Sequence, residues 1–123
     1  MNCFPDELDF EALFCVEPTR LDKDCPFYYD ESTFRFENQT ESFFVKMTPS
    51  YGEFLLEVKS KTSNELLAYQ SFKTVDKLEI VTDTADAAKI LLTMEKDRDL
   101  YMTTVEITFK PRFCFIMKEH FVG

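Results

Sequence analysis

The sequence has no tryptophan, only two glycines and only one histidine among its 123 residues. Phosphate-binding loops of the P-loop and dinucleotide-binding kinds need closely spaced glycines. Gly52 and Gly123 form no such motif, so nucleotide enzymes of these two kinds are excluded. His120 is the single candidate proton shuttle, and its place three residues from the end indicates neither a Ser-His-Asp nor a Cys-His catalytic set.

Closely spaced cysteine pairs are also missing. The four cysteines include no Cys-x-x-Cys motif, so a zinc ribbon is not predicted. The N-terminus lacks the basic and apolar regions of a secretory signal, so we expect reduced thiols and an intracellular protein, cytoplasmic or nuclear. Cys15 and Cys114 stand among apolar residues, which predicts that both pack as small hydrophobic side chains.

Long apolar runs and an excess of positive charge are absent as well. No run approaches the ~18 residues of a membrane-spanning helix, so we expect no membrane partner. The balance of 14 basic against 23 acidic residues gives a net charge of −9, which argues against direct binding of nucleic acid through its phosphates. The length indicates a single domain over residues 1–123.

Alternation of apolar and polar residues is the strongest positive signal, because it places apolar side chains on one face of a strand. Because both faces of the last such segment, Phe113–Met117, are apolar, we expect that strand to be central or covered on both sides. The predicted strands are Thr33–Glu37, Phe43–Met47, Glu53–Lys59, Leu66–Phe72, Leu78–Val81, Tyr101–Phe109 and Phe113–Met117.

A helix is predicted over Ala85–Met94. Asp83 and Thr84 are residue types that cap a helix N-terminus, and apolar residues then recur on one stripe. The alternative is a strand, because Ile90, Leu92 and the methionine that ends the segment also alternate.

The first sixteen residues allow either a short helix with Phe10, Leu13 and Phe14 on one side, or a strand over Leu13–Val16. All the patterns together predict a mainly β fold, α+β at the margin. The expected architecture is an antiparallel β-sandwich or partly open barrel of about six to eight strands with one or two short helices.

The order strand, helix, strand, strand from Leu78 through Met117, with a helix such as Asp86–Met94 before a hairpin, resembles half of a sliding-clamp subunit. This resemblance covers that segment alone and implies a clamp-like domain. Clamps line a DNA channel with basic helices, whereas this helix has only Lys89 and Lys96 against its acidic residues.

No set of residues indicates catalysis, a metal site or a bound cofactor, so we expect a protein that is not an enzyme. The 14 phenylalanines are more than one core strictly needs, so either the core is packed with phenylalanine or some of these rings lie at an interface. Phe43 and Phe44 are adjacent, so in a one-sided sheet one of them must face outward.

The sequence therefore predicts a non-catalytic intracellular protein–protein interaction domain, acting as an adaptor or assembly subunit. Its partner would be another protein, in a hetero-complex or a homodimer, bound through an exposed aromatic or apolar patch or a sheet edge. The alternatives are a β-barrel that binds a small apolar ligand and an acidic, clamp-like or nucleic-acid-mimicking domain. The candidate partner-binding residues are Phe10, Phe14, Tyr28, Tyr29 and Phe44.

Overall fold

Two antiparallel β-sheets and a short helix are the main elements of the structure, a computed structural model that describes residues 2–95 and 101–121. The first sheet holds, in spatial order, β1 (Thr19–Arg20), β2 (Ser32–Glu37), β3 (Glu41–Thr48), β4 (Glu53–Ser60) and β5 (Leu66–Phe72). The second sheet holds β6 (Lys77–Asp83), β7 (Ala88–Glu95), β8 (Tyr101–Lys110) and β9 (Cys114–Phe121). The described helices are α1 (Glu7–Phe14) and the 3-10 helices η1 (Phe27–Tyr29) and η2 (Pro49–Tyr51).

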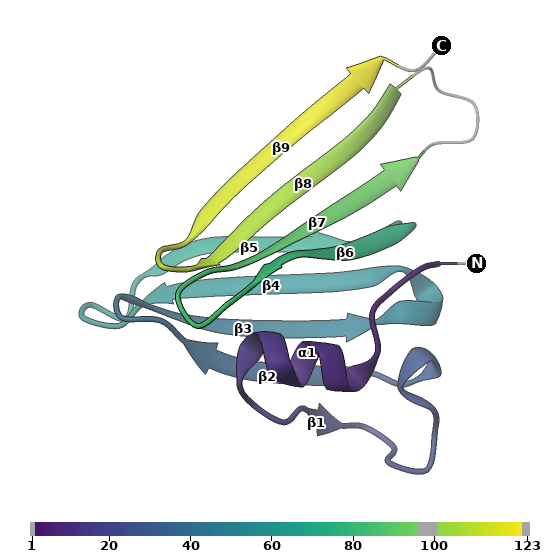
Figure 1. Ribbon diagram of the computed structural model, residues 1–123, viewed down its shortest axis with the longest axis horizontal. Coiled ribbons are helices and arrows are strands. Elements are labelled where there is room, and N and C mark those ends of the chain that lie inside the picture. The colour runs from purple at the N-terminus through teal and green to yellow at the C-terminus, as the bar shows by residue number, and fades with distance from the viewer. Residues whose placement is uncertain (1, 96–100, 122–123) are drawn as a thin grey trace.

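Both sheets are meanders, in which strands that follow one another along the chain pair side by side. The sheets lie close together at their hairpin ends, whereas β8 and β9 run away from the first sheet at the other end (Figure 1). The predicted fold class, a mainly β antiparallel sandwich, is confirmed. The described residues form nine strands, because β1, of two residues, and β7 are added to the seven that were predicted.

The prediction of a helix over Ala85–Met94 is wrong, and the alternative prediction of a strand is correct. β7 occupies most of this segment, and its alternate residues, including Ile90 and Leu92, are buried. Thr84 caps a hairpin turn instead of a helix, because its hydroxyl oxygen accepts the N–H of Ala87 at 3.0 Å. β7 pairs with β6 on one side and β8 on the other, and these backbone bonds outweigh the local helix signal. The clamp-like order of elements is therefore not present.

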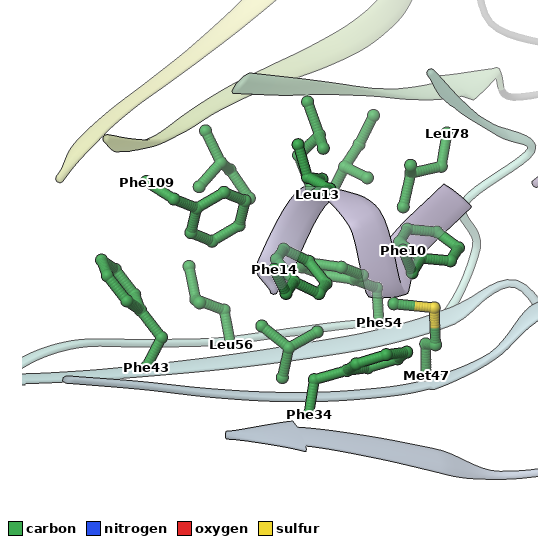
Figure 2. Packing of buried hydrophobic residues seen from close by; sticks show 14 of the residues in the cluster. Phe10, Leu13, Phe14, Phe34, Phe43, Met47, Phe54, Leu56, Leu78 and Phe109 are labelled. Atoms are coloured by element: carbon green, nitrogen blue, oxygen red, sulfur yellow. The ribbon is translucent and has the colours of Figure 1, made fainter. Parts of the chain in front are cut away.

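Residues near the N-terminus form α1, which lies between the two sheets (Figure 2). The backbone N–H of Asp6 donates to the carboxylate of Asp9 at 3.0 Å in the first turn. The helix ends at Cys15, whose φ of 57° is in the left-handed region. Its apolar residues Phe10 and Phe14 are both buried, so the helix fills the space that the diverging sheets leave.

The abundance of phenylalanine is explained largely by the core. Phe14 contacts rings from both sheets, since its centroid lies 4.2 Å from that of Phe36 and 5.3 Å from that of Phe109. Figure 2 shows Phe14 from the helix, Phe34 and Phe43 from the first sheet and Phe109 from the second sheet pointing into the same core. The fourteen rings divide into six that are buried (Phe10, Phe14, Phe34, Phe43, Phe54, Phe109), six packed against the core (Phe4, Phe27, Phe36, Phe72, Phe113, Phe115) and two others, Phe44 and Phe121.

Polar contacts also join the two sheets where their hairpins meet. The side-chain amide of Asn38, in the β2–β3 turn, donates to the carbonyl of Phe109 at 2.7 Å. The N–H of Phe113, in the β8–β9 turn, donates to the Glu41 carboxylate at 2.9 Å. Burial alone would raise the pKa of Glu41, but hydrogen bonds from Thr40, Asn38 and Phe113 outweigh it and hold that pKa below its ordinary value. We call Asn38, Glu41 and these two partners the hairpin clasp.

The strand that begins near Phe113 was expected to be central or covered on both sides, and this expectation is wrong. β9 pairs only with β8 and forms an edge of the second sheet. Its apolar residues Ile116, Met117 and Phe121 are exposed by 40%, 56% and 65%, so neither face of this strand is fully covered.

Both cysteines expected to be buried are exposed. Cys15 lies at the end of α1 and Cys114 begins β9, and in each case the apolar neighbours point inward while the thiol does not. All four cysteines are free thiols.

Candidate protein-interaction surfaces

Two of the predicted partner-binding residues are part of the core. Phe10 has none of its surface exposed and Phe14 only 3%, and their rings stack on each other at 5.9 Å. The expectation that they anchor a partner is therefore corrected. Their spacing was sufficient to predict an apolar helix face but could not tell which surface covers it.

The predicted Tyr28 and Tyr29 lie in η1 and have different roles. The preceding Phe27 faces the core, with its centroid 5.9 Å from that of Phe10. Tyr28 is half-buried, and its hydroxyl donates to the carbonyl of Asn2 at 2.9 Å. Tyr29 packs edge-on against Tyr28 at 5.1 Å and remains 60% exposed. The turn thus presents one tyrosine to solvent on a well-packed base.

A buried ion pair holds the chain on both sides of η1. The Nε of Arg20 donates to Asp30 at 2.6 Å, and its Nη1 donates to Glu7 of α1 at 3.0 Å. Burial alone would raise the pKa of Asp30, but the hydrogen bonds from Arg20 and from the backbone of Asp22 and Glu31 outweigh it and lower that pKa. The hydrogen bond to Asp30 also raises the pKa of Arg20. The pair therefore stays charged and ties α1, β1 and η1 together.

A second exposed tyrosine comes from η2, which lies against η1. Tyr51 is 71% exposed, and Gly52 follows it with a φ of +66°. The Asn2 side chain donates to the carbonyls of Pro49 and Ser50 at 3.2 and 3.1 Å. Asn2 thus joins both turns, and we call the exposed pair Tyr29 and Tyr51 the tyrosine surface.

Negative charge is concentrated in the N-terminal segment of the chain, which includes Tyr29. Residues 1–31 contain nine acidic and two basic side chains, which amounts to −7 of the total of −9. Arg20, one of the two basic residues, is already paired with Glu7 and Asp30. Asp22 and Asp24, in the connection between β1 and η1, are exposed. Tyr29 therefore belongs to the most acidic segment of the chain, and Tyr51 comes from η2, which lies against η1.

The prediction that one of two adjacent phenylalanines faces outward is confirmed. Phe43 is buried, whereas Phe44 lies on the outer face of the first sheet with the Arg35 guanidinium 4.7 Å from its ring centroid. An open groove of about 600 Å³ surrounds it, and charged residues such as Glu57 and Lys59 line part of that groove. This is not the enclosed apolar cavity that a carrier of small ligands would need.

The single histidine, His120, lies on β9 and is paired with β8. The Nε2 of His120 lies 2.8 Å from the hydroxyl of Thr104, on the outer face of the second sheet. Within residues 2–95 and 101–121, no three histidine, cysteine or acidic side chains gather in a way that could hold a metal ion. None of the helices in those ranges is long and apolar enough to cross a membrane.

Sequence reasoning missed Tyr51. Its signal was the turn-forming sequence Pro-Ser-Tyr-Gly, because turns lie at the surface and this one contains a large aromatic residue. The sequence also gave no indication that η2 would lie against η1, because that contact depends on how residues distant in the chain pack together.

Comparison with known proteins identifies the fold class and one solved example of it. No known protein family matches the chain, and no curated protein sequence matches it. A chain of the solved contact-dependent growth inhibition toxin–immunity protein complex from Klebsiella pneumoniae 342 has the same fold, with a TM-score of 0.73. The match covers 97% of both chains at 14% sequence identity, so the two share their architecture over nearly their whole length.

Proposed function

We propose that this chain is a non-catalytic, intracellular protein-binding domain that forms a hetero-complex through the tyrosine surface and the acidic residues beside it. Its partner is a protein with a basic surface. The observation that carries the proposal is that two exposed tyrosines are presented by adjoining turns, η1 and η2, and that η1 lies in the segment 1–31, whose net charge is −7.

Exposed tyrosines on a rigid base are well suited to binding a protein. Tyrosine is enriched at the residues that dominate interface energies, because it offers a large apolar ring and a hydroxyl with few rotatable bonds. Tyr29 and Tyr51 keep most of their area free, while Tyr28 and Asn2 fix the turns beneath them. Little conformational freedom would be lost on binding, which favours affinity.

The acidic residues of this chain indicate that its partner has a basic surface. An acidic surface attracts a basic one at long range and raises the rate of association, in a way that salt weakens. Asp22 and Asp24 are exposed, so they are available for this role.

The fold likeness supports the same class of function. The structurally similar chain comes from a complex of a toxin with an immunity protein, that is, from a pair of proteins that bind each other. By analogy, this chain would be one member of a two-protein complex, and a role as inhibitor, adaptor or assembly subunit is part of the proposal.

The test begins with affinity capture on the immobilised chain from an extract of cells that produce it. The captured protein is then purified and titrated against wild type and against a Tyr29→Ala, Tyr51→Ala double variant by calorimetry. Loss of two central tyrosines should weaken the complex by about 30-fold or more. Asp22→Asn with Asp24→Asn should slow association and reduce its dependence on salt.

A matched control is available at the other end of the molecule. Tyr101 and Phe121 are 51% and 65% exposed and lie 5.7 Å apart, so their double alanine variant removes a similar aromatic area. The proposal expects this control to bind within about threefold of wild type. If the control loses binding and the Tyr29, Tyr51 variant does not, the proposed surface is wrong. If no purified partner binds wild type at all, the function is wrong as well.

A further inference from the structure

The segment ahead of α1 is hydrogen-bonded to three parts of the chain that lie far apart in sequence. The side-chain amide of Asn2 donates to carbonyls of η2, and the carbonyl of Asn2 accepts the hydroxyl of Tyr28 in η1. The backbone of Cys3 donates to the carbonyl of Asp76 at 2.9 Å and accepts the N–H of Leu78 at 2.8 Å. These bonds join both turns to β6 of the second sheet (Figure 1), and we call Asn2 and Cys3 the strap.

The turn η2 also packs closely against the residues that lead into β6. The N–H of Val75, which is fully buried, donates to the carbonyl of Gly52 at 2.9 Å. A Cβ atom at Gly52 would lie 2.7 Å from the carbonyl oxygen of Val75 and 3.2 Å from the side-chain nitrogen of Asn2. The glycine is therefore needed here for its small size as well as for its φ of +66°, because Val75 and the strap leave no space beside it.

Both turns are short and depend on the rest of the molecule for their arrangement. η1 and η2 are three residues each, and the hydrogen bonds of such short 3-10 helices have poor geometry. η1 has a further support, because Asp30, which follows it, pairs with Arg20. η2 is supported by the strap and by Val75. The position of Tyr51 should therefore depend on the strap more than the position of Tyr29 does.

We propose that the strap is a conformational device that fixes Tyr29 and Tyr51 relative to each other, with Asn2 as its positioning residue. Asn2 is half-buried, and it is bound to η2 through its side chain and to η1 through its carbonyl. Releasing the strap would leave both tyrosines on the surface but let the two turns move independently. A partner would then have to order them on binding, which weakens affinity without removing a contact. The effect on binding rests on the proposed function, whereas the effect on the free chain does not.

Hydrogen exchange of the free chain, followed by NMR, tests the device without a partner. Asn2→Ala removes the side-chain bonds to η2 and should speed exchange of the N–H groups of Gly52 and Val75 by about tenfold or more. The N–H of Tyr29 should change less, since the alanine variant keeps the carbonyl that η1 binds. The N–H of Lys61, which lies near the hairpin clasp and donates to the carbonyl before Glu41, should keep its wild-type rate.

Cys3 provides a matched pair of variants. Cys3→Pro removes the N–H that donates to Asp76, and it should speed exchange at Gly52 and Val75 in the same way as Asn2→Ala. Cys3→Ala keeps that N–H and loses only an exposed thiol, so it should exchange like wild type. Circular dichroism and urea unfolding establish that each variant is folded. If Cys3→Pro does not fold, Asn2→Ala decides the question by itself.

Calorimetry with the purified partner then tests the effect on binding. Asn2→Ala should weaken the complex by about tenfold when both exposed tyrosines are present. In a Tyr51→Ala background the same substitution should weaken it by no more than about twofold, because there is no second tyrosine to position. A residue that only stabilised the fold would cost the same affinity in both backgrounds.

The outcomes distinguish failure of the strap from failure of the proposed function. Unchanged exchange at Gly52 and Val75 in Asn2→Ala overturns the inference whether or not a partner is found. An Asn2→Ala variant that binds like wild type, or that loses equal affinity in both backgrounds, also overturns it when the Tyr29→Ala, Tyr51→Ala variant still loses binding. If that double variant binds like wild type, the proposed function fails instead, and the exchange rates alone decide whether the strap holds the turns.

Discussion

The two edges of the five-stranded sheet are built in opposite ways. At the β1 edge, Arg20 pairs with Asp30 and Glu7, and α1 covers the inner face next to β2. At the β5 edge, Tyr69 is exposed and the strand carries no charge. The chain therefore protects one edge with its own N-terminal segment and leaves the other open. Residues at the first edge should therefore matter more for stability than residues at the second.

The largest effect is expected in the core beside the protected edge. Phe14→Ala removes a ring that contacts Phe36 at 4.2 Å and Phe109 at 5.3 Å, and should lower the free energy of unfolding by about 3–5 kcal/mol. Tyr69→Ala at the open edge should change it by about 0.5 kcal/mol or less. Urea unfolding followed by circular dichroism measures both. Equal losses would remove the contrast between the two edges.

A smaller effect is expected at the buried ion pair. Asp30→Asn weakens the charge-assisted bonds from Arg20 and should cost roughly 1.5–3 kcal/mol at neutral pH. The pKa of Asp30 is lowered by folding, so its contribution is fully present above the unfolded value of about 4 and is lost as pH falls through the lower folded value. The difference between wild type and variant should therefore shrink in acid.

Urea titrations between neutral pH and about pH 3 would follow this difference. Asp24→Asn is the matched control, because Asp24 is exposed and its carboxylate is in no salt bridge within the described residues. If Asp24→Asn showed the same loss and the same acid dependence, the ion pair would not be what stabilises the protected edge.

The smallest effect of the three is expected at the hairpin clasp, which joins the two sheets and belongs to neither edge of the first sheet. Glu41→Gln keeps an acceptor for the N–H of Phe113 but loses the charge, and should cost about 0.5–1.5 kcal/mol. Because folding lowers the pKa of Glu41, the wild-type advantage should also decline in acid. Glu37→Gln, on an exposed side chain at the end of β2, serves as control in the same denaturation series. A larger loss for Glu37→Gln would contradict the role of the clasp.

Strands were predictable because their apolar residues alternate, and the structure buries those residues at Phe34, Val45 and Leu56 in neighbouring strands. β7 was missed because a short apolar segment such as Ala88–Met94 fits both periods. Its pairing on both sides with β6 and β8 decides the outcome, and that pairing is not local.

The candidate surfaces were only partly predictable. Adjacent phenylalanines showed that one ring had to face outward, and Phe44 does. The burial of Phe10 and Phe14 depends on two sheets diverging enough to admit a helix, which no local pattern indicates. The open edge at β5 had a signal, an uncharged strand between Glu65 and Lys73, but strand order decides whether such a strand is an edge.

The contact between Phe14 and Phe109 also has a consequence for the order of events during synthesis. The helix is made early, yet it packs against a strand made much later. At about 5–20 residues per second, translation needs roughly 5–20 s to cover the residues between them. Throughout that interval the apolar face of α1 has no complete core to cover it. The nascent chain would then expose Phe10 and Phe14 to chaperones or to other nascent chains, even though the finished fold hides both.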